Sequence, residues 1–230
     1  MSEVKIIEIL EDVNAENNRT ADAVREMMKR NGTFFVNFMS SPGSGKTTLL
    51  TRLINMLKDE YKIGEMDVDI KSSVDAKRVA DETGIRSMQI HNGGLCHIDA
   101  DMTSRAIMEY GAEDLDILIL ENIGNLVCPA EFDTGAHLNI CLLSIPEGDD
   151  KPLKYPLMFT VSDVVLLTKI DTLPAFDFDL EKAKRNILNL NPNAIIIPVS
   201  AKNGTGMAEV ASLIKKEVEK IKNESAGTLC

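Results

Sequence analysis

The chain has 230 residues, of which 44% are hydrophobic and 27% charged, which is enough for one substantial core. Its formal net charge of −11 argues against a general surface for nucleic acid or for anionic membranes, because such surfaces need clustered Lys and Arg. The longest apolar runs are only as long as strands, and the charged start lacks the apolar core of a signal peptide. We therefore expect no membrane contact and a cytoplasmic location.

Helical and strand-like segments alternate along the chain. Residues 1–30 are expected to form an N-terminal helical extension, and residues 31–230 a single main domain. Strands are expected at 33–39, 61–68, 86–91, 115–122, 138–145, 163–170 and 193–200, and helices after the first strand through Leu57 and at 98–109, 179–190 and 206–222. Strands that alternate with helices and are apolar on both faces predict a three-layer α/β domain with a mostly parallel sheet.

The segment SSPGSGKTT, at 40–48, lies between an expected strand and an expected helix, which is the context of a phosphate-binding loop. Its glycines let backbone N–H groups approach phosphates, while Lys46 would contact the β- and γ-phosphates and Thr47 would bind Mg²⁺. Ser40 stands where the usual pattern begins with glycine. This context favours a P-loop over a chance glycine-rich turn. The residues assigned to phosphate are Gly43, Ser44, Gly45, Lys46, Thr47 and Thr48.

Two later segments indicate that the base is guanine. In TKID, Asp171 can accept the N1–H and 2-amino protons of guanine, and Lys169 can pack along the purine. Thr168 replaces the Asn of the commoner N-K-x-D form. In PVSAK, the N–H of Ala201 would point at guanine O6. Their order after a P-loop favours GTP over ATP, and the residues assigned to the base are Thr168, Lys169, Asp171, Ser200, Ala201 and Lys202.

Acidic residues are expected around the γ-phosphate. Glu121 ends an expected strand, and the N–H of Gly124 could contact the γ-phosphate, so that this segment would move on hydrolysis. For Asp67, after the second strand, a solvated loop position is the favoured interpretation. The candidates for catalysis are Lys46, Asp75 and Glu121, and those for Mg²⁺ are Thr47, Asp69, Asp75 and Glu121. With no arginine evident near these segments, slow turnover is expected.

The stretch HNGGLCHIDAD, at 91–101, puts Cys96 next to His97. Adjacent side chains point apart, which argues against a catalytic thiolate–imidazole pair, although at a turn both could face one ion. A position at a helix start would also lower the pKa of the thiol. Cys128, four residues after Gly124, offers a third ligand. Thiolate and imidazole suit Zn²⁺, Ni²⁺ or copper, and a second copy of the chain could complete the site.

Together, SSPGSGKTTLL, CHIDA, ENIGNLVCPAEFD and EGDDKPLKYP resemble the HypB family, the GTPases of nickel insertion into [NiFe]-hydrogenase, from about residue 20 to 222. The resemblance implies slow GTP hydrolysis to GDP with Mg²⁺, a GTP-dependent homodimer, and delivery of Ni²⁺ with a HypA-type nickel chaperone to the hydrogenase large-subunit precursor. It implies Ni²⁺ or Zn²⁺ on Cys96, His97 and Cys128 at the dimer interface. It also implies Asp75 in switch I and both Glu121 and Gly124 in switch II.

Some relatives carry an N-terminal CxxCGC nickel site or a histidine-rich tract. This sequence has no Cys before Cys96 and only three His, so nickel storage is not expected. His91 and His137 are interpreted as structural or solvated. Three alternatives stay open: a GTPase for another nickel enzyme, such as the urease accessory type with its Cys-Pro-His motif; a GTP-controlled structural zinc switch; and a small-molecule kinase with a lid at 145–160.

Overall fold

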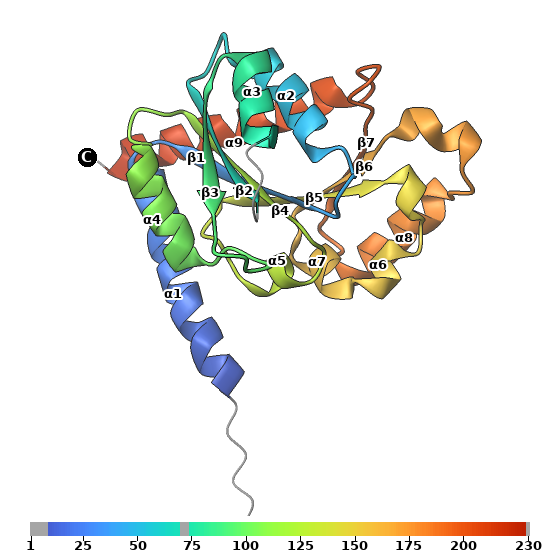
Figure 1. The fold of residues 1–230 in the computed structure, drawn as a ribbon, viewed down its shortest axis with the longest axis horizontal. Coiled ribbons are helices and arrows are strands. Elements are labelled where there is room, and N and C mark those ends of the chain that lie inside the picture. Colours follow the sequence, from blue (N-terminus) through green and yellow to red (C-terminus); the bar gives the residue numbers. More distant parts are fainter. Residues whose placement is uncertain (1–8, 70–73, 229–230) are drawn as a thin grey trace, which may run out of the picture.

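Seven parallel strands form the centre of the computed structural model, which describes residues 9–69 and 74–228 (Figure 1). Along the sheet the strands follow the order β3-β2-β4-β1-β5-β6-β7, and each neighbouring pair is parallel. The strands are β1 (Phe34–Ser40), β2 (Ile63–Asp69), β3 (Arg86–His91), β4 (Ile117–Gly124), β5 (Leu138–Ser144), β6 (Val164–Thr168) and β7 (Ile195–Pro198). The predicted α/β class and parallel sheet are confirmed.

Helices cover both faces of this sheet, which gives the three predicted layers (Figure 1). One face packs against α2 (Lys46–Leu57), α3 (Val74–Thr83) and α9 (Met207–Thr228). The other face packs against α1 (Ile9–Arg30), α4 (Ala100–Tyr110), α5 (Cys128–Glu131), α7 (Pro156–Val161) and α8 (Leu180–Leu190). Short helical turns complete the connections at η1 (Ile145–Glu147), α6 (Lys151–Lys154) and η2 (Ile170–Ala175). Throughout the described residues, every helix is too short or too polar to cross a membrane.

Two differences from the predicted boundaries affect the site. The strand β2 extends to Asp69, one residue beyond the expected strand at 61–68, and β4 continues past its expected end at 122 to Gly124. Asp67 is only 4% exposed, so the expectation of a solvated loop position is wrong. The physical reason is that the carboxyl ends of these parallel strands border a polar cavity, where acidic side chains replace the apolar ones that normally mark a buried strand.

The helix α3 was not predicted, and it changes the setting of Asp75. The pattern of apolar positions in VDAKRVADET is sparse, with Ala76 and Val79 buried against the sheet and the other positions mostly polar. A ten-residue helix of this kind depends on tertiary packing more than on its own periodicity. Asp75 therefore lies in the first turn of a helix instead of a loop.

The described part of α1 packs on the domain. Its side chains Val24 and Met28 are buried in one cluster with residues of the sheet and of α4. Arg25 forms an ion pair with Asp133 at 2.7 Å. These contacts attach α1 to the sheet, and the division of the chain at residue 30 stays a prediction.

His137 connects α1 to the first strand. Its Nδ1 accepts the backbone N–H of Phe35 at 2.9 Å, so its Nε2 carries the proton and donates to the carbonyl of Arg25 at 3.1 Å. Burial lowers the pKa of His137 to about 4. These contacts agree with the structural interpretation of this histidine, whereas His91 is exposed at the end of β3.

We expect His137 to make folding sensitive to acid. Its folded pKa of about 4 lies below the ordinary value of 6.5, so the unfolded chain binds more protons between these limits. The free energy of unfolding should therefore fall as pH drops from about 6.5 towards about 4, by up to about 3 kcal/mol from this group. Urea unfolding of the wild type and of His137→Gln over this pH range compares how steeply the free energy of unfolding depends on pH in the two proteins. His91→Gln is the control, and equal slopes for wild type and His137→Gln would contradict the assignment.

Candidate functional site

The segment between β1 and α2 has the backbone of a phosphate-binding loop. Gly43 and Gly45 have φ of 77° and 95°, in the left-handed region that favours glycine, and Gly45 caps α2. The N-terminal N–H groups of this 12-residue helix thus face the loop. Ser40 occupies the usual glycine position as the last residue of β1; it is buried, and its hydroxyl donates to the carbonyl of Ser41 at 2.9 Å. The serine therefore fits without disturbing the loop.

A cavity of about 670 Å³ opens in front of this loop. Lys46 Nζ lies 3.0 Å from Glu121 Oε1, and Thr47 Oγ1 donates to the same oxygen at 2.8 Å. The structure thus brings Lys46, Thr47 and Glu121 into direct contact. The cavity is lined by residues 40–48 together with Asp67, Val68, Asp69, Asp75, Arg78, Glu121, Ile123, Gly124 and Lys169.

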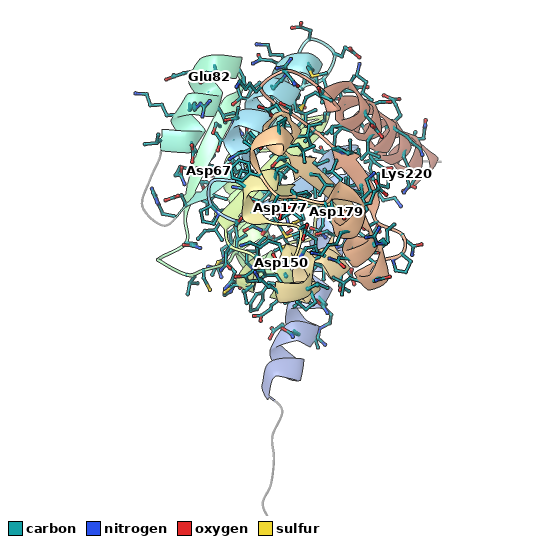
Figure 2. The ribbon with its side chains drawn as sticks, turned by 90° about the vertical axis from the view of Figure 1, so that its right-hand side faces the viewer. Asp67, Glu82, Asp150, Asp177, Asp179 and Lys220 are labelled. Atoms are coloured by element: carbon teal, nitrogen blue, oxygen red, sulfur yellow. The ribbon has the colours of Figure 1, made fainter. Side chains whose placement is uncertain are left out.

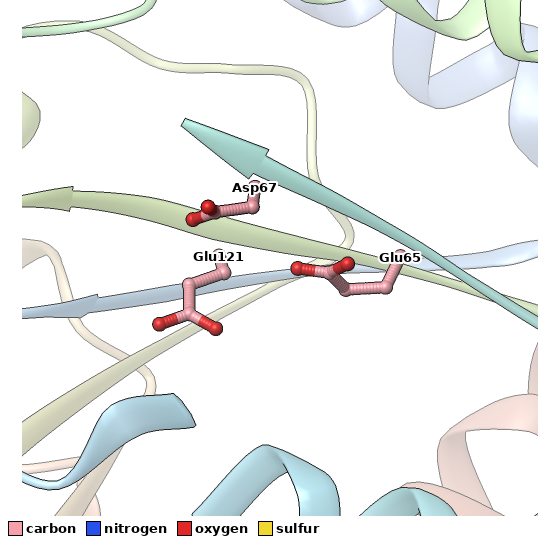
Figure 3. A group of neighbouring side chains, drawn as sticks. All are labelled: Glu65, Asp67 and Glu121. Carbon is pink, nitrogen blue, oxygen red and sulfur yellow. The ribbon is translucent and has the colours of Figure 1, made fainter. Parts of the chain in front are cut away.

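Three buried carboxyl groups, those of Glu65, Asp67 and Glu121, lie close together (Figure 3), and the last two line this cavity. Asp67 on β2 lies beside Glu121 on β4 in the strand register, and Glu65 precedes Asp67 by two residues, so all three point to one face. Among the described residues, they form the one group of three potential metal ligands whose donor atoms all lie within 4.8 Å of one another. Glu65 was not among the residues predicted from the sequence, although its spacing of two from Asp67 was the available signal.

The crowding of these groups opposes their ionisation. The pKa of Glu65 is raised to about 9 and that of Asp67 to about 7, and burial is the largest cause in both cases. The charge of Glu121 contributes to both increases. Glu65 accepts a hydrogen bond from Ser87, but Glu121 Oε2 and Asp67 Oδ2 have no partner among the described residues. Buried, unsatisfied carboxylate oxygens beside the Thr47 hydroxyl are the hard oxygen donors that fit Mg²⁺.

A second cavity of about 300 Å³ adjoins the first, and five of the six residues predicted to bind the base line it. The sixth, Ser200, is buried behind this lining. Asp171 accepts a hydrogen bond from the Ser200 hydroxyl at 2.6 Å, which orients its carboxylate. Ala201 and Lys202 line the same cavity. Arg52 of α2, which sequence analysis missed, donates to the Ala201 carbonyl at 2.7 Å and so holds this loop.

Lys169 and Thr168 join the two cavities. The Thr168 hydroxyl donates to the Ser44 carbonyl at 2.8 Å, so the threonine found in place of Asn ties β6 to the phosphate loop. Lys169 Nζ donates to the Gly43 carbonyl at 2.6 Å. Its backbone has φ of 59°, the one positive value at a non-glycine position among the described residues. A local strain of this kind is typical of functional sites.

Cys96 and His97 lie in the loop between β3 and α4. The helix begins at Ala100, with Asp99 as its cap, so Cys96 is not in the first turn. Its Sγ is 3.9 Å from His97 Nδ1, so the two adjacent side chains do approach each other. The pKa of the Cys96 thiol is raised, and a hydrogen bond with Cys128 is the largest cause. The prediction that a helix start would lower this pKa is therefore wrong.

The third candidate ligand, Cys128, begins α5 on the segment that follows β4. The three donor atoms of Cys96, His97 and Cys128 are not all within 4.8 Å of one another. The imidazole of His97 stacks on Phe132 at 4.0 Å between ring centroids, with 7° between the planes. Phe132, which was not singled out from the sequence, therefore fixes the orientation of this histidine.

A short series of contacts connects the phosphate loop with this Cys/His group. A Cβ added at Gly124 would lie 3.0 Å from Cγ of Pro42, so the β4 end packs closely on the loop. The next residue, Asn125, donates from Nδ2 to the Cys96 carbonyl at 3.3 Å and accepts the Val127 N–H at 2.9 Å. The segment that includes Gly124 and Asn125 thus contacts both the phosphate loop and the backbone of Cys96.

A phosphate loop at the end of a central parallel strand, continuous with a second cavity, defines a P-loop nucleotide-binding protein. The model of the CobW/HypB/UreG nucleotide-binding domain matches residues 35–198. Hydrogenase maturation factor HypB of Rhizobium leguminosarum bv. viciae is 44% identical over 207 residues, which cover 90% of this chain and 69% of the relative. The probable hydrogenase maturation factor HypB of Methanocaldococcus jannaschii is 35% identical, over 95% of this chain and 99% of the relative.

Solved structures agree with these matches. The crystal structure of HypB from Helicobacter pylori in complex with nickel superimposes with a TM-score of 0.82 and 38% identity, covering 89% of this chain and 96% of that one. The chain therefore belongs to the HypB family of hydrogenase maturation factors.

Proposed function

We propose that this protein hydrolyses GTP and couples its nucleotide state to Ni²⁺ held by Cys96, His97 and Cys128, so that nickel is delivered for hydrogenase maturation. The observation that carries the proposal is the contact path from Pro42 through Gly124 and Asn125 to Cys96. A shift of the β4 end on γ-phosphate loss would move the backbone that holds these ligands. The nickel complex of the Helicobacter pylori relative supports the choice of metal.

Hydrolysis would depend mainly on electrostatic stabilisation and positioning. Lys46 leaves Glu121 to contact the β- and γ-phosphates, and the N–H groups at the start of α2 surround the phosphate oxygens. Asp69 and Asp75, which line the cavity, are the candidates for orienting the water. Thr47 and Glu121, with Asp69 and Asp75, would hold Mg²⁺, which supplies positive charge to the phosphates when bound.

The proposed metal group favours a GTP-dependent homodimer. Three ligands leave a four-coordinate ion incomplete, and Cys96 is exposed, so a second copy of the chain could add further thiolates. In this proposal the dimer receives Ni²⁺ in cooperation with a HypA-type chaperone and passes it towards the hydrogenase large-subunit precursor. Zn²⁺ is the competing ion, because the same donors bind it well.

One alternative target has specific support. A relative in Helicobacter hepaticus, 40% identical over 93% of this chain, is described as a hydrogenase/urease maturation factor. This relative favours a second nickel enzyme as the alternative recipient. The small-molecule kinase has no such support, since the segment once expected as a lid forms η1, α6 and α7, with Met158 and Phe159 buried in the core.

The coupling is tested by titrating Ni²⁺ and, separately, Zn²⁺ into protein loaded with GDP or with a non-hydrolysable GTP analogue, while light scattering follows the mass. We expect affinity for Ni²⁺ and mass to differ between the two nucleotide states. Equal Ni²⁺ affinities in both nucleotide states would show that metal binding is not coupled to the nucleotide. A monomer under every condition would contradict a metal site shared between two copies of the chain.

Guanine recognition gives a specificity prediction. Asp171→Asn should lower affinity for GTP by about 10²-fold or more and raise affinity for xanthosine triphosphate, because the amide can donate where the carboxylate only accepts. Competition binding of the two nucleotides measures this change in preference. Asp177→Asn, an exposed position outside the cavity, is the matched control. An unchanged preference for GTP in Asp171→Asn would contradict the assignment of Asp171 to the base.

A further inference from the structure

Arg78 lies at the wall of the phosphate cavity, one helical turn after Asp75 on α3. The sequence had suggested no arginine near the switches, because nothing local indicated that α3 packs beside the loop. Arg78 Nε forms an ion pair with Glu82 at 2.9 Å. Figure 2 shows Glu82 and Asp67 on the same side of the molecule. Asp75 and Arg78 both line the cavity, so α3 borders it.

The guanidinium keeps unused hydrogen-bonding capacity. Within the described residues, its two terminal nitrogens have no hydrogen-bond partner, and the side chain is 42% exposed. The Glu82 contact uses only Nε, so no other described residue occupies the two terminal NH₂ groups. A planar guanidinium binds two oxygens of a phosphate at once, which an ammonium group does not do.

The charge balance of the cavity increases the importance of this group. Its lining contains three basic residues, Lys46, Arg78 and Lys169, and four carboxylates, Asp67, Asp69, Asp75 and Glu121. Lys46 contacts Glu121, and Lys169 is held by the Gly43 carbonyl on the side of the base cavity. Among the residues that the structure describes, Arg78 is thus the basic residue of the lining that forms no hydrogen bond or ion pair with the loop or with the cavity carboxylates.

We propose that Arg78 is a catalytic arginine supplied by the same chain, which binds the γ-phosphate and stabilises its transfer to water. In this step the water oxygen bonds to the γ-phosphorus. The bond from this phosphorus to the β–γ bridging oxygen breaks, its electron pair stays on GDP, and both water protons leave with the phosphate as H₂PO₄⁻. Arg78 neutralises the charge that develops on the phosphoryl oxygens. The inference rests on the proposed GTP hydrolysis.

Three variants test this role. Arg78→Ala should lower the single-turnover rate of bound GTP by about 10²-fold or more, and Arg78→Lys should restore only part of it. Added guanidinium ion at non-denaturing concentration should partly rescue Arg78→Ala, which a purely structural defect would not permit. Arg105→Ala is the matched control, because Arg105 also forms an (i, i+4) ion pair on a helix surface, with Asp101 on α4, but lies outside the cavity.

Binding measurements separate this inference from the proposed function. Arg78→Ala should weaken binding of a GTP analogue and of inorganic triphosphate by about tenfold, and leave GDP and pyrophosphate within about twofold. An unchanged rate, a loss that guanidinium does not rescue, or equal weakening of GDP and GTP analogue would each overturn the role of Arg78. If the wild type binds no guanine nucleotide, the proposed function fails, and the triphosphate comparison still decides whether Arg78 contacts a third phosphate.

Discussion

Replacing Lys46 by methionine is expected to reduce GTP turnover by at least about 10²-fold. Methionine keeps an unbranched stem of similar shape and removes the ammonium group that would contact the β- and γ-phosphates. Single-turnover hydrolysis and GTP affinity measure the two parts of the loss. Lys215→Met is the matched control, since Lys215 forms its ion pair with Glu60 on the surface. A Lys46→Met variant with near-normal turnover would contradict the assignment.

The same substitution should also destabilise the nucleotide-free protein. Lys46 and Glu121 form a buried ion pair, with side chains 12% and 2% exposed, and Glu65 and Asp67 lie next to it. Removing one partner of such a pair typically costs about 3–5 kcal/mol, because a buried charge loses its counterion. Adding Glu121→Gln should restore much of the stability without restoring hydrolysis. Urea unfolding of the single and double variants, compared with turnover, thus distinguishes a folding defect from a catalytic one.

Replacing either Cys96 or Cys128 by serine is expected to lower Ni²⁺ affinity by about 10²-fold or more. Serine has nearly the same shape but offers no thiolate, the soft ligand that binds Ni²⁺ strongly. The sulfur-to-nickel absorption band, followed during titration, reports both affinity and ligand type. Mass measurement with a GTP analogue tests whether dimerisation changes with the metal.

The chain provides an internal control for this experiment. Cys141 is fully buried on β5, and burial raises the pKa of its thiol. Cys141→Ala should therefore keep Ni²⁺ binding, while metal-free turnover should stay normal in the Cys96 and Cys128 variants. Sulfur-to-nickel absorption of unchanged intensity in both Cys96→Ser and Cys128→Ser would exclude these thiolates as ligands.

Features determined by neighbouring residues were predictable from the sequence. The glycine spacing of the phosphate loop and the buried strand before it identify the segment, because they reflect local backbone geometry. The alternation of strands and helices likewise predicts the parallel sheet. Asp171 and Ala201 follow consecutive expected strands, and they line one cavity because the carboxyl ends of parallel strands share an edge.

Features determined by distant residues were not predictable in this way. Asp67 is buried because the strand register puts it beside Glu121. The thiol of Cys96 depends on a contact with Cys128, 32 positions later, rather than on a helix end. Arg78 and Arg52 reach the cavity and the Ala201 loop only through helix packing. Local patterns identify such residues as charged surface positions, and tertiary contacts decide their surroundings.

The two adjoining cavities have Ser44, Gly45, Thr48 and Lys169 in common. A nucleotide that spans them is equivalent to two ligands joined by a short tether. Once the guanosine part is bound, the phosphates are held at an effective concentration in about the millimolar range or higher. Guanosine and inorganic triphosphate should thus each bind far more weakly than GTP, even when both are supplied together. The covalent ribose linkage, rather than any single contact, would then account for much of the affinity.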